Sequence, residues 1–264
     1  MPARTRLPVS PPSPSDEVIF RELVARGESN GSCGPQFGSL ASVRQYRRLY
    51  RMVRCHLEPG AQVLDWGTAC GHFSYFLTHA GYRATGFDFE DVSQAGWLDE
   101  PYERHVVGGS PADPVHLPFA DAAFDAVASV GVLEHVRETG GTEAASLSEI
   151  RRVLRPGGLF LCFHFPNRNS WIEFLTGFVP GKHYHHAYRY VRSDIERLTA
   201  QSGLELLEVE RYGILPRNIL RRLPGPLRHA RWVADLWGTA DAVAGVALSP
   251  LCQNYAFVAR RPDR

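Results

Sequence analysis

Several features that would place this 264-residue sequence in a special class of protein are missing. Its five cysteines are odd in number and include no Cys-x-x-Cys pair, which argues against structural zinc and against a disulfide framework. The formal net charge is only +1, so the chain as a whole has no field that attracts nucleic acid or an anionic membrane. No apolar run reaches the roughly 18 residues that span a bilayer. We therefore expect a chain that folds around its own core.

The first 60 residues also lack strand-like patterns. Residues 1–14 are rich in proline and serine and have no periodicity, which predicts a disordered arm. They contain no apolar segment of the signal-peptide kind, so we expect a cytoplasmic protein. Residues 15–60 carry two stretches with apolar residues at helical spacing, separated by a glycine-rich segment. We predict that these helices cover the functional site.

From residue 61 to residue 264, short apolar runs alternate with helical patterns. Strands are predicted over residues 61–66, 83–89, 103–107, 124–132, 159–165, 204–212 and 254–260. Helices are predicted over residues 72–80, 144–154, 191–201 and 229–248. Such alternation predicts one α/β domain, with a parallel sheet and helices on both of its faces.

The turn after the first predicted strand, DWGTACG over residues 65–71, points to a cofactor. Glycines at this position let the backbone approach a ligand at the carboxyl ends of the strands. The spacing is Gly-x-x-x-Gly, whereas dinucleotide sites have Gly-x-Gly-x-x-Gly, which argues against a nicotinamide oxidoreductase. Asp65 would repel a pyrophosphate, but it suits a cofactor with a cationic end, such as S-adenosylmethionine (SAM). Asp88 ends the next strand, where a carboxylate can accept the ribose hydroxyls.

Five segments then resemble, in order, the motifs of class I SAM-dependent methyltransferases, especially the branch with ubiquinone and menaquinone methyltransferases. The five segments are VLDWGTACG (63–71), GFD (86–88), ADPVHLPFADAAFDAV (112–127), VGVLEHV (130–136) and LSEIRRVLRPGGLF (147–160). The resemblance covers about residues 40–212. It implies a Rossmann-like sheet, mostly parallel with an antiparallel closing strand, and SAM as the cofactor.

The resemblance also implies roles for single residues. The methionine end of SAM would lie at Asp65, Gly67 and Gly71, and the ribose at Asp88, and Thr68 in the same turn would also bind the cofactor. Further residues implied are Asp113 for the adenine amino group and Val132 or Leu133 for the lower face of the cofactor. Thr68 and Ala69 replace the usual Cys and Gly of the loop. If the loop keeps the family geometry, Ala69 needs a backbone angle that alanine tolerates poorly.

Histidines are the candidates for the catalytic base. A hydroxyl acceptor must lose its proton, and imidazole is the side chain whose ordinary pKa best suits this near neutrality. His135 and His164 lie at the ends of predicted strands, and His183, His185 and His186 form a cluster. We take His135, His164 and His186 as candidate bases. We predict no metal, because no nearby carboxylate has a suitable spacing from the histidine cluster.

Two insertions, near residues 166–190 and 213–250, are predicted to lie on the acceptor side. The first holds the apolar stretch WIEFLTGFVPG (171–181), which suits either a greasy acceptor or core packing. In the second, Arg217, Arg221 and Arg222 suit an anionic substrate or a peripheral membrane contact, or form a solvated face. The helix over 229–248 has an apolar stripe that suits the core or a dimer face, so both a monomer and a homodimer stay open.

Together these patterns favour a SAM-dependent methyltransferase that acts on a small molecule. The acceptor is predicted to be a hydroxyl oxygen of a metabolite, glycoside or lipid-like compound. Two alternatives remain: carbon methylation of a quinone-like ring, and an inactive methyltransferase-like binding subunit with the altered loop. Nucleic acid is not expected as a partner, because the chain has neither an Asn-Pro-Pro-Tyr-like tetrapeptide nor a basic appendage beyond the arginine segment.

Overall fold

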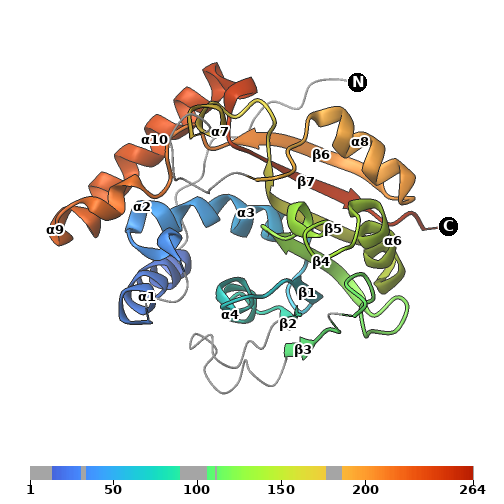
Figure 1. Cartoon of the computed structure of the whole chain (residues 1–264). Coiled ribbons are helices and arrows are strands. Elements are labelled where there is room, and N and C mark those ends of the chain that lie inside the picture. The colour runs from blue at the N-terminus through green and yellow to red at the C-terminus, as the bar shows by residue number, and fades with distance from the viewer. Residues whose placement is uncertain (1–13, 31–33, 90–105, 111, 177–185, 264) are drawn as a thin grey trace.

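A seven-stranded sheet in the order β3-β2-β1-β4-β5-β7-β6 forms the centre of the molecule (Figure 1). The computed structural model describes residues 14–30, 34–89, 106–110, 112–176 and 186–263. The strands are β1 (Gln62–Trp66), β2 (Arg83–Asp88), β3 (Val106–Gly108), β4 (Phe124–Val130), β5 (Leu154–Pro166), β6 (Glu205–Tyr212) and β7 (Asn254–Arg260). Only β7 runs antiparallel to its neighbours, β5 and β6. The predicted mostly parallel sheet with an antiparallel closing strand is confirmed.

Helices cover both faces of this sheet (Figure 1). One face carries α1 (Pro14–Asn30), α2 (Leu40–Val43), α3 (Arg47–His56), α4 (His72–His79) and α10 (Arg231–Ala247). The other face carries α6 (Glu143–Val153) and α8 (Arg192–Gln201). The predicted disordered arm lies almost wholly outside the described residues, which begin at Pro14. Within the part of the chain that is described, no helix combines the length and the apolar character needed to cross a bilayer.

The central strands β1, β4 and β7 are buried on both faces, which explains their continuous apolar sequences. Alternate residues of a strand point to opposite faces, so Leu161 joins the core beside α4, and Phe160 joins the core beside α6. Phe163 and Phe165 should share a face by this rule, yet they lie in opposite cores. The pairing of β5 with β7 shifts between Cys162 and Phe165, so His164 is the extra residue of a β-bulge. His164 has φ +70° and lies inside β5 rather than at its end.

Three predicted elements differ from the structure. The second N-terminal helix is divided into α2, the 3₁₀ turn Arg44–Tyr46 and α3. The apolar stretch 171–181, which was interpreted as a connection, begins with the helix α7 (Trp171–Thr176). The core interpretation of the last helix is wrong for Trp232, Leu236 and Val243, which are 62%, 65% and 67% exposed on α10. Its interpretation as a dimer face stays a prediction.

Candidate active site

The glycine turn between β1 and α4 is held against the end of β2. Both Gly67 and Thr68 donate a backbone N–H to the carbonyl oxygen of Phe87, at 2.8 and 3.0 Å. Gly67 has φ +74°, and a Cβ at this residue would lie only 2.3 Å from Cγ2 of Val132. Glycine is therefore required there, both for the backbone angle and for the close approach to the end of β4.

The side chain of Asp65 stabilises this turn through hydrogen bonds. Its side chain is buried, and Oδ2 accepts hydrogen bonds from the Thr68 hydroxyl at 2.9 Å and from the Ser74 hydroxyl and N–H at 2.7 and 3.0 Å. Burial raises the pKa of Asp65 to about 6, although the bonds from Ser74 and Thr68 oppose that rise. Thr68 is buried as well, with its hydroxyl turned toward Asp65.

Asp88 holds the same turn from the neighbouring strand. Its Oδ2 accepts the backbone N–H of Ala69, and its Oδ1 accepts that of Phe89, both at 2.8 Å. Ala69 has φ +43°, the left-handed region that alanine was expected to need here. Two carboxylates therefore end adjacent strands on either side of a glycine turn, an arrangement that fits the cationic end and the ribose of SAM. The role of each residue toward SAM remains a prediction.

The two other cofactor residues lie in different surroundings. Asp113 is exposed in the loop after β3, where its Oδ1 accepts the backbone N–H groups of Val115 and His116 at 3.3 and 3.1 Å. Leu133 is fully buried in the core beside α6. Val132 packs against Gly67 instead. Which of the two residues contacts the lower face of the cofactor stays a prediction.

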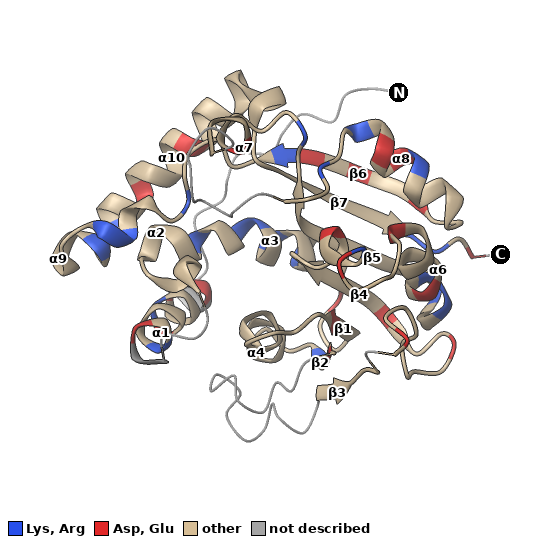
Figure 2. Cartoon of the chain, viewed as in Figure 1, with Lys and Arg blue, Asp and Glu red and all other residues tan. Residues whose placement is uncertain are grey.

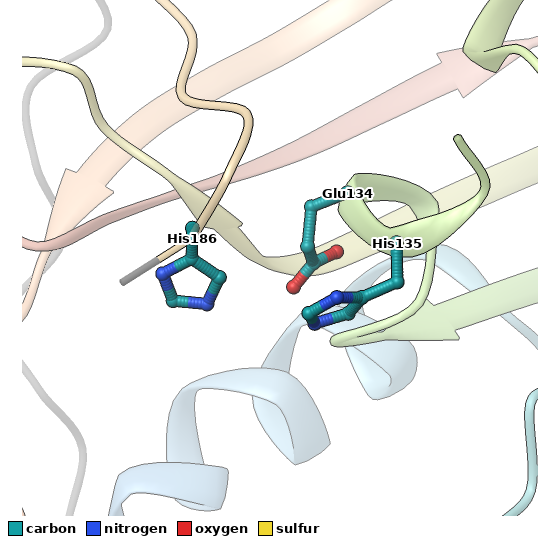
Figure 3. A group of neighbouring side chains, drawn as sticks. All are labelled: Glu134, His135 and His186. Atoms are coloured by element: carbon teal, nitrogen blue, oxygen red, sulfur yellow. The ribbon is translucent and has the colours of Figure 1, made fainter. Parts of the chain in front are cut away.

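After β4 the chain forms the 3₁₀ turn η4 (Leu133–His135). Here His135 lies near His186, another of the candidate bases. The rings of His135 and His186 lie 5.8 Å apart. The carboxylate of Glu134 points into the space between the two rings (Figure 3). One ligand-type atom from each of these three side chains lies within 4.8 Å of the others. We call Glu134, His135 and His186 the Glu–His cluster; His183 and His185 lie outside the described residues.

This cluster includes one buried carboxylate, Glu134, and contacts a second one, Glu173. Glu134 is only 2% exposed, and its Oε2 has no hydrogen-bond partner within the described residues. Burial raises the pKa of Glu134 to about 8, an effect that its own backbone N–H and Arg217 oppose. Glu173 on α7 holds Nδ1 of His186 through Oε1 at 2.8 Å. The expectation that no suitable carboxylate lies near the histidines is therefore wrong.

His164 belongs to a different set of contacts. Its Nδ1 lies 2.7 Å from the Tyr212 hydroxyl and 2.7 Å from Nη1 of Arg217, which also donates to Oε1 of Gln45 at 2.7 Å. Because arginine can only donate, Nδ1 must present its lone pair, and the ring is neutral. Burial and the Arg217 charge lower the pKa of His164 well below its ordinary value. His164 thus accepts hydrogen bonds here, and its role as a base stays a prediction.

The three arginines of the basic segment do not form one surface. Arg217 is half-buried against His164, whereas Arg221 and Arg222 are exposed on the 3₁₀ turn η5 (Ile219–Arg222). The short helix α9 (Gly225–Arg228) carries one further basic residue, Arg228, and Figure 2 shows this helix beside the long and mostly uncharged α10. Arg217 therefore differs from the two exposed arginines in burial and in contacts, and the predicted roles of all three stay predictions.

Comparisons with known proteins agree on one domain type. Residues 64–162 match a family described as a methyltransferase domain. A demethylmenaquinone methyltransferase of Symbiobacterium thermophilum is 30% identical over 162 residues, which are 58% of this chain and 61% of that protein. A probable tRNA methyltransferase 9B of Homo sapiens is 29% identical over 132 residues, 50% of this chain and 27% of that protein. This chain thus spans only part of the length of these relatives.

A solved structure with a similar fold covers nearly the whole chain. It is the Burkholderia thailandensis 1,6-didemethyltoxoflavin-N1-methyltransferase with bound 1,6-didemethyltoxoflavin and S-adenosylhomocysteine. The TM-score is 0.52 at 17% identity, and the match covers 98% of this chain and 94% of that one. At this identity the likeness concerns the fold alone.

Proposed function

Since this chain carries a class I SAM-dependent methyltransferase domain, we propose that it transfers the methyl group of SAM to a hydroxyl oxygen of a small molecule. The observation that carries the oxygen preference is the Glu–His cluster at the end of β4. A hydroxyl is a poor nucleophile while it is protonated, and groups that help to remove the proton contribute about 10² to 10⁴ in rate. The cluster provides such groups beside the turn that holds the cofactor.

Bound SAM supplies an electrophilic methyl group on a positively charged sulfur. The chain's own residues must hold the acceptor oxygen in line with that group, because positioning accounts for much of the barrier in such a transfer. The glycine turn, Asp65 and Asp88 orient the cofactor from one side. The Glu–His cluster lies at the end of β4, and Arg217, from the segment after β6, lies against His164 of β5, where these groups can hold and ionise a hydroxyl.

Identifying the methylated atom tests this proposal. The chain would be incubated with SAM that carries a carbon-13 methyl group and with metabolite extracts from a strain lacking the gene. The carbon-13 chemical shift of the product distinguishes a methoxy group from a methyl group on carbon. A labelled methoxy product is expected, and a product labelled only on carbon or nitrogen would overturn the oxygen assignment.

Carbon methylation of a quinone-like ring is the second candidate, because one relative is named a demethylmenaquinone methyltransferase. The same labelling experiment separates the two reactions. An inactive binding subunit would bind SAM without forming any labelled product.

The cofactor assignment has its own test. Replacing Asp88 by alanine removes a carboxylate from the predicted ribose site, and a charge-assisted hydrogen bond contributes roughly 1.5–3 kcal/mol. SAM affinity measured by calorimetry should fall about tenfold or more. Asp121→Ala is the matched control, because Asp121 is an exposed acid paired with Arg152. Equal SAM affinity in the parent and the Asp88 variant would remove Asp88 from the site.

The surface beside the second insertion supports a lipid-like or anionic acceptor. Arg221 and Arg222 are exposed beside Ile219, and α10 exposes Trp232 and Leu236. Exposed basic and apolar side chains suit an anionic membrane, where each arginine contributes about 1 kcal/mol. Replacing both arginines by glutamate should lower sedimentation with phosphatidylglycerol vesicles about tenfold or more. The same exchange at Arg192 and Arg197, exposed on α8, should leave sedimentation unchanged.

A further inference from the structure

Three side chains of the Glu–His cluster have the composition of a metal site. Two histidines and one carboxylate are the protein ligands of many catalytic zinc centres, which keep further positions open for water or substrate. Ligand atoms of Glu134, His135 and His186 lie within 4.8 Å of one another. A tetrahedral ion with bonds of about 2.0–2.2 Å keeps its ligand atoms roughly 3.3–3.6 Å apart, so separations of up to 4.8 Å in the cluster must shorten by up to about 1.2–1.5 Å.

His186 is already oriented as a metal ligand. Its Nδ1 is held by the Glu173 carboxylate at 2.8 Å, and its other ring nitrogen, Nε2, faces Glu134 (Figure 3). Metal-bound histidines nearly always bond a carboxylate, carbonyl or water through the second nitrogen, which fixes the ring and makes it a better ligand. In the same way, Nδ1 of His135 lies 3.0 Å from Oε1 of Glu138. Each imidazole therefore has a carboxylate behind it.

Glu134 gives the independent indication that a cation is bound. It is 2% exposed, its carboxylate points between the two rings, and Oε2 has no partner within the described residues (Figure 3). A buried carboxylate oxygen without a partner is costly and is rare in folded proteins. A divalent cation held by Glu134 and both histidines would remove that cost.

We propose that Glu134, His135 and His186 bind a divalent metal ion of the zinc type, and that an open position on this ion takes the hydroxyl oxygen of the acceptor. The site itself is independent of the proposed function, whereas its role in the reaction rests on that function. A bound cation lowers the pKa of an attached hydroxyl, so the two histidines serve as ligands and no imidazole has to accept the proton.

The reaction then balances without any further reagent. The acceptor O–H bond breaks, and its proton goes to solvent water on the exposed side of His135. A new bond forms between the oxygen and the methyl carbon while the bond between sulfur and that carbon breaks. The sulfur keeps the electron pair, so the cofactor leaves as a neutral thioether.

Metal binding by the full chain tests the site without any acceptor. After dialysis against a chelator, calorimetry with zinc chloride should show one saturable site. Glu134→Gln, His135→Gln and His186→Gln should each weaken zinc binding at least about a hundredfold, and Glu173→Gln about 10- to 100-fold. His56→Gln is the matched control, because His56 lies 3.4 Å from Glu208 on the surface and should leave binding unchanged. Cobalt(II) absorption gives a second readout, whose visible bands should change in the three ligand variants but not in the control.

The outcomes separate the site from the function. No saturable zinc binding in the parent, or equal binding in all three ligand variants, overturns the metal site even if methyl transfer is observed. Binding that is lost in the ligand variants supports the site even if no methyl transfer is found, and then the proposed function fails on its own. If each variant keeps the parental circular dichroism spectrum, a loss of binding is assigned to the lost ligand rather than to unfolding.

Discussion

Two groups of histidines lie close together at the carboxyl edge of the sheet, but their neighbours carry opposite charge. His164 faces a cation, Nη1 of Arg217 at 2.7 Å, and a tyrosine hydroxyl at the same distance. His186 faces carboxylates, with Glu173 at 2.8 Å and Glu134 within the same cluster. Burial and the Arg217 charge lower the pKa of His164, whereas the carboxylates beside His186 place negative charge where a metal ion would lie. The two histidines therefore differ in the charge of their neighbours, although the residue type is the same.

The difference also assigns distinct tasks to the two groups. His164 and Gln45 share Nη1 of Arg217, so they hold the guanidinium in place. The bulge and the left-handed backbone of His164 keep its ring directed at Arg217, and strain of this kind is common at functional sites. His164 therefore holds Arg217 in place, whereas under our proposal the Glu–His cluster would hold the acceptor hydroxyl.

The largest effect expected from this comparison is on the rate of methyl transfer. In single-turnover experiments, His186→Gln should lower the rate at least about a hundredfold, because it removes a group that ionises the hydroxyl. His164→Gln should lower it less than about tenfold, since glutamine can still accept a hydrogen bond from Arg217. SAM affinity should be unchanged in both. If the His164 variant is the slower one, the assignment of the two groups must be reversed.

A third histidine, His72, extends the comparison to the free energy of unfolding. It is buried against the rings of Tyr46 and Phe37, and neither ring nitrogen has a partner in the described part of the chain. Burial lowers its pKa from 6.5 to about 4. The unfolded chain therefore binds a proton that the folded chain does not bind between these pH values, so the free energy of unfolding falls as the pH drops.

His72→Leu should remove this dependence. Each pKa unit corresponds to 1.36 kcal/mol, so the difference between variant and parent should change by up to about 3 kcal/mol between pH 6.5 and pH 4. Urea unfolding at several pH values measures it. Glu134 and Asp65, whose pKa values are raised, contribute with the opposite sign in both proteins and cancel in the difference. Parallel curves for variant and parent would show that His72 is not protonated differently on folding.

The smallest effect concerns the backbone of the cofactor turn. Ala69 and His164 both have positive φ values, +43° and +70°, but only Ala69 replaces a glycine of the family motif. A left-handed alanine costs about 1–2 kcal/mol, and a glycine costs about 0.5–1 kcal/mol in chain entropy. Ala69→Gly should therefore raise the free energy of unfolding by about 0.5–1 kcal/mol, and Ala80→Gly, whose φ is negative, should lower it. A decrease in stability for Ala69→Gly would contradict this assignment of strain.

The cofactor half of the site could be predicted because its parts are close together in the sequence. Asp65, Gly67 and Gly71 belong to one strand-to-helix turn, and Asp88 ends the next strand. Parallel neighbours bring those two strand ends to the same edge, as the pairing of β1 with β2 shows. A local pattern and one topological rule were sufficient.

The acceptor half could not be predicted in the same way. Glu173 lies 13 residues before His186 in the sequence and contacts it from the short helix α7. This helix was not predicted, because its residues were interpreted as an apolar connection. Arg217 meets His164 across 53 residues of chain. The only local signal was Glu134 itself, an acid next to His135 in the LEHV segment, which spacing rules for metal ligands did not single out.

The sequence by itself determined the α/β class, the positions of the central strands along the chain and the glycine turn between two carboxylates. These features follow from hydrophobic periodicity and from backbone angles, which neighbouring residues decide. Only the tertiary structure decided which histidine faces an arginine and which faces carboxylates, and that most of α10 is exposed. Burial and charge depend on residues brought together from distant parts of the chain, and these two quantities set the protonation and ligand chemistry of an imidazole.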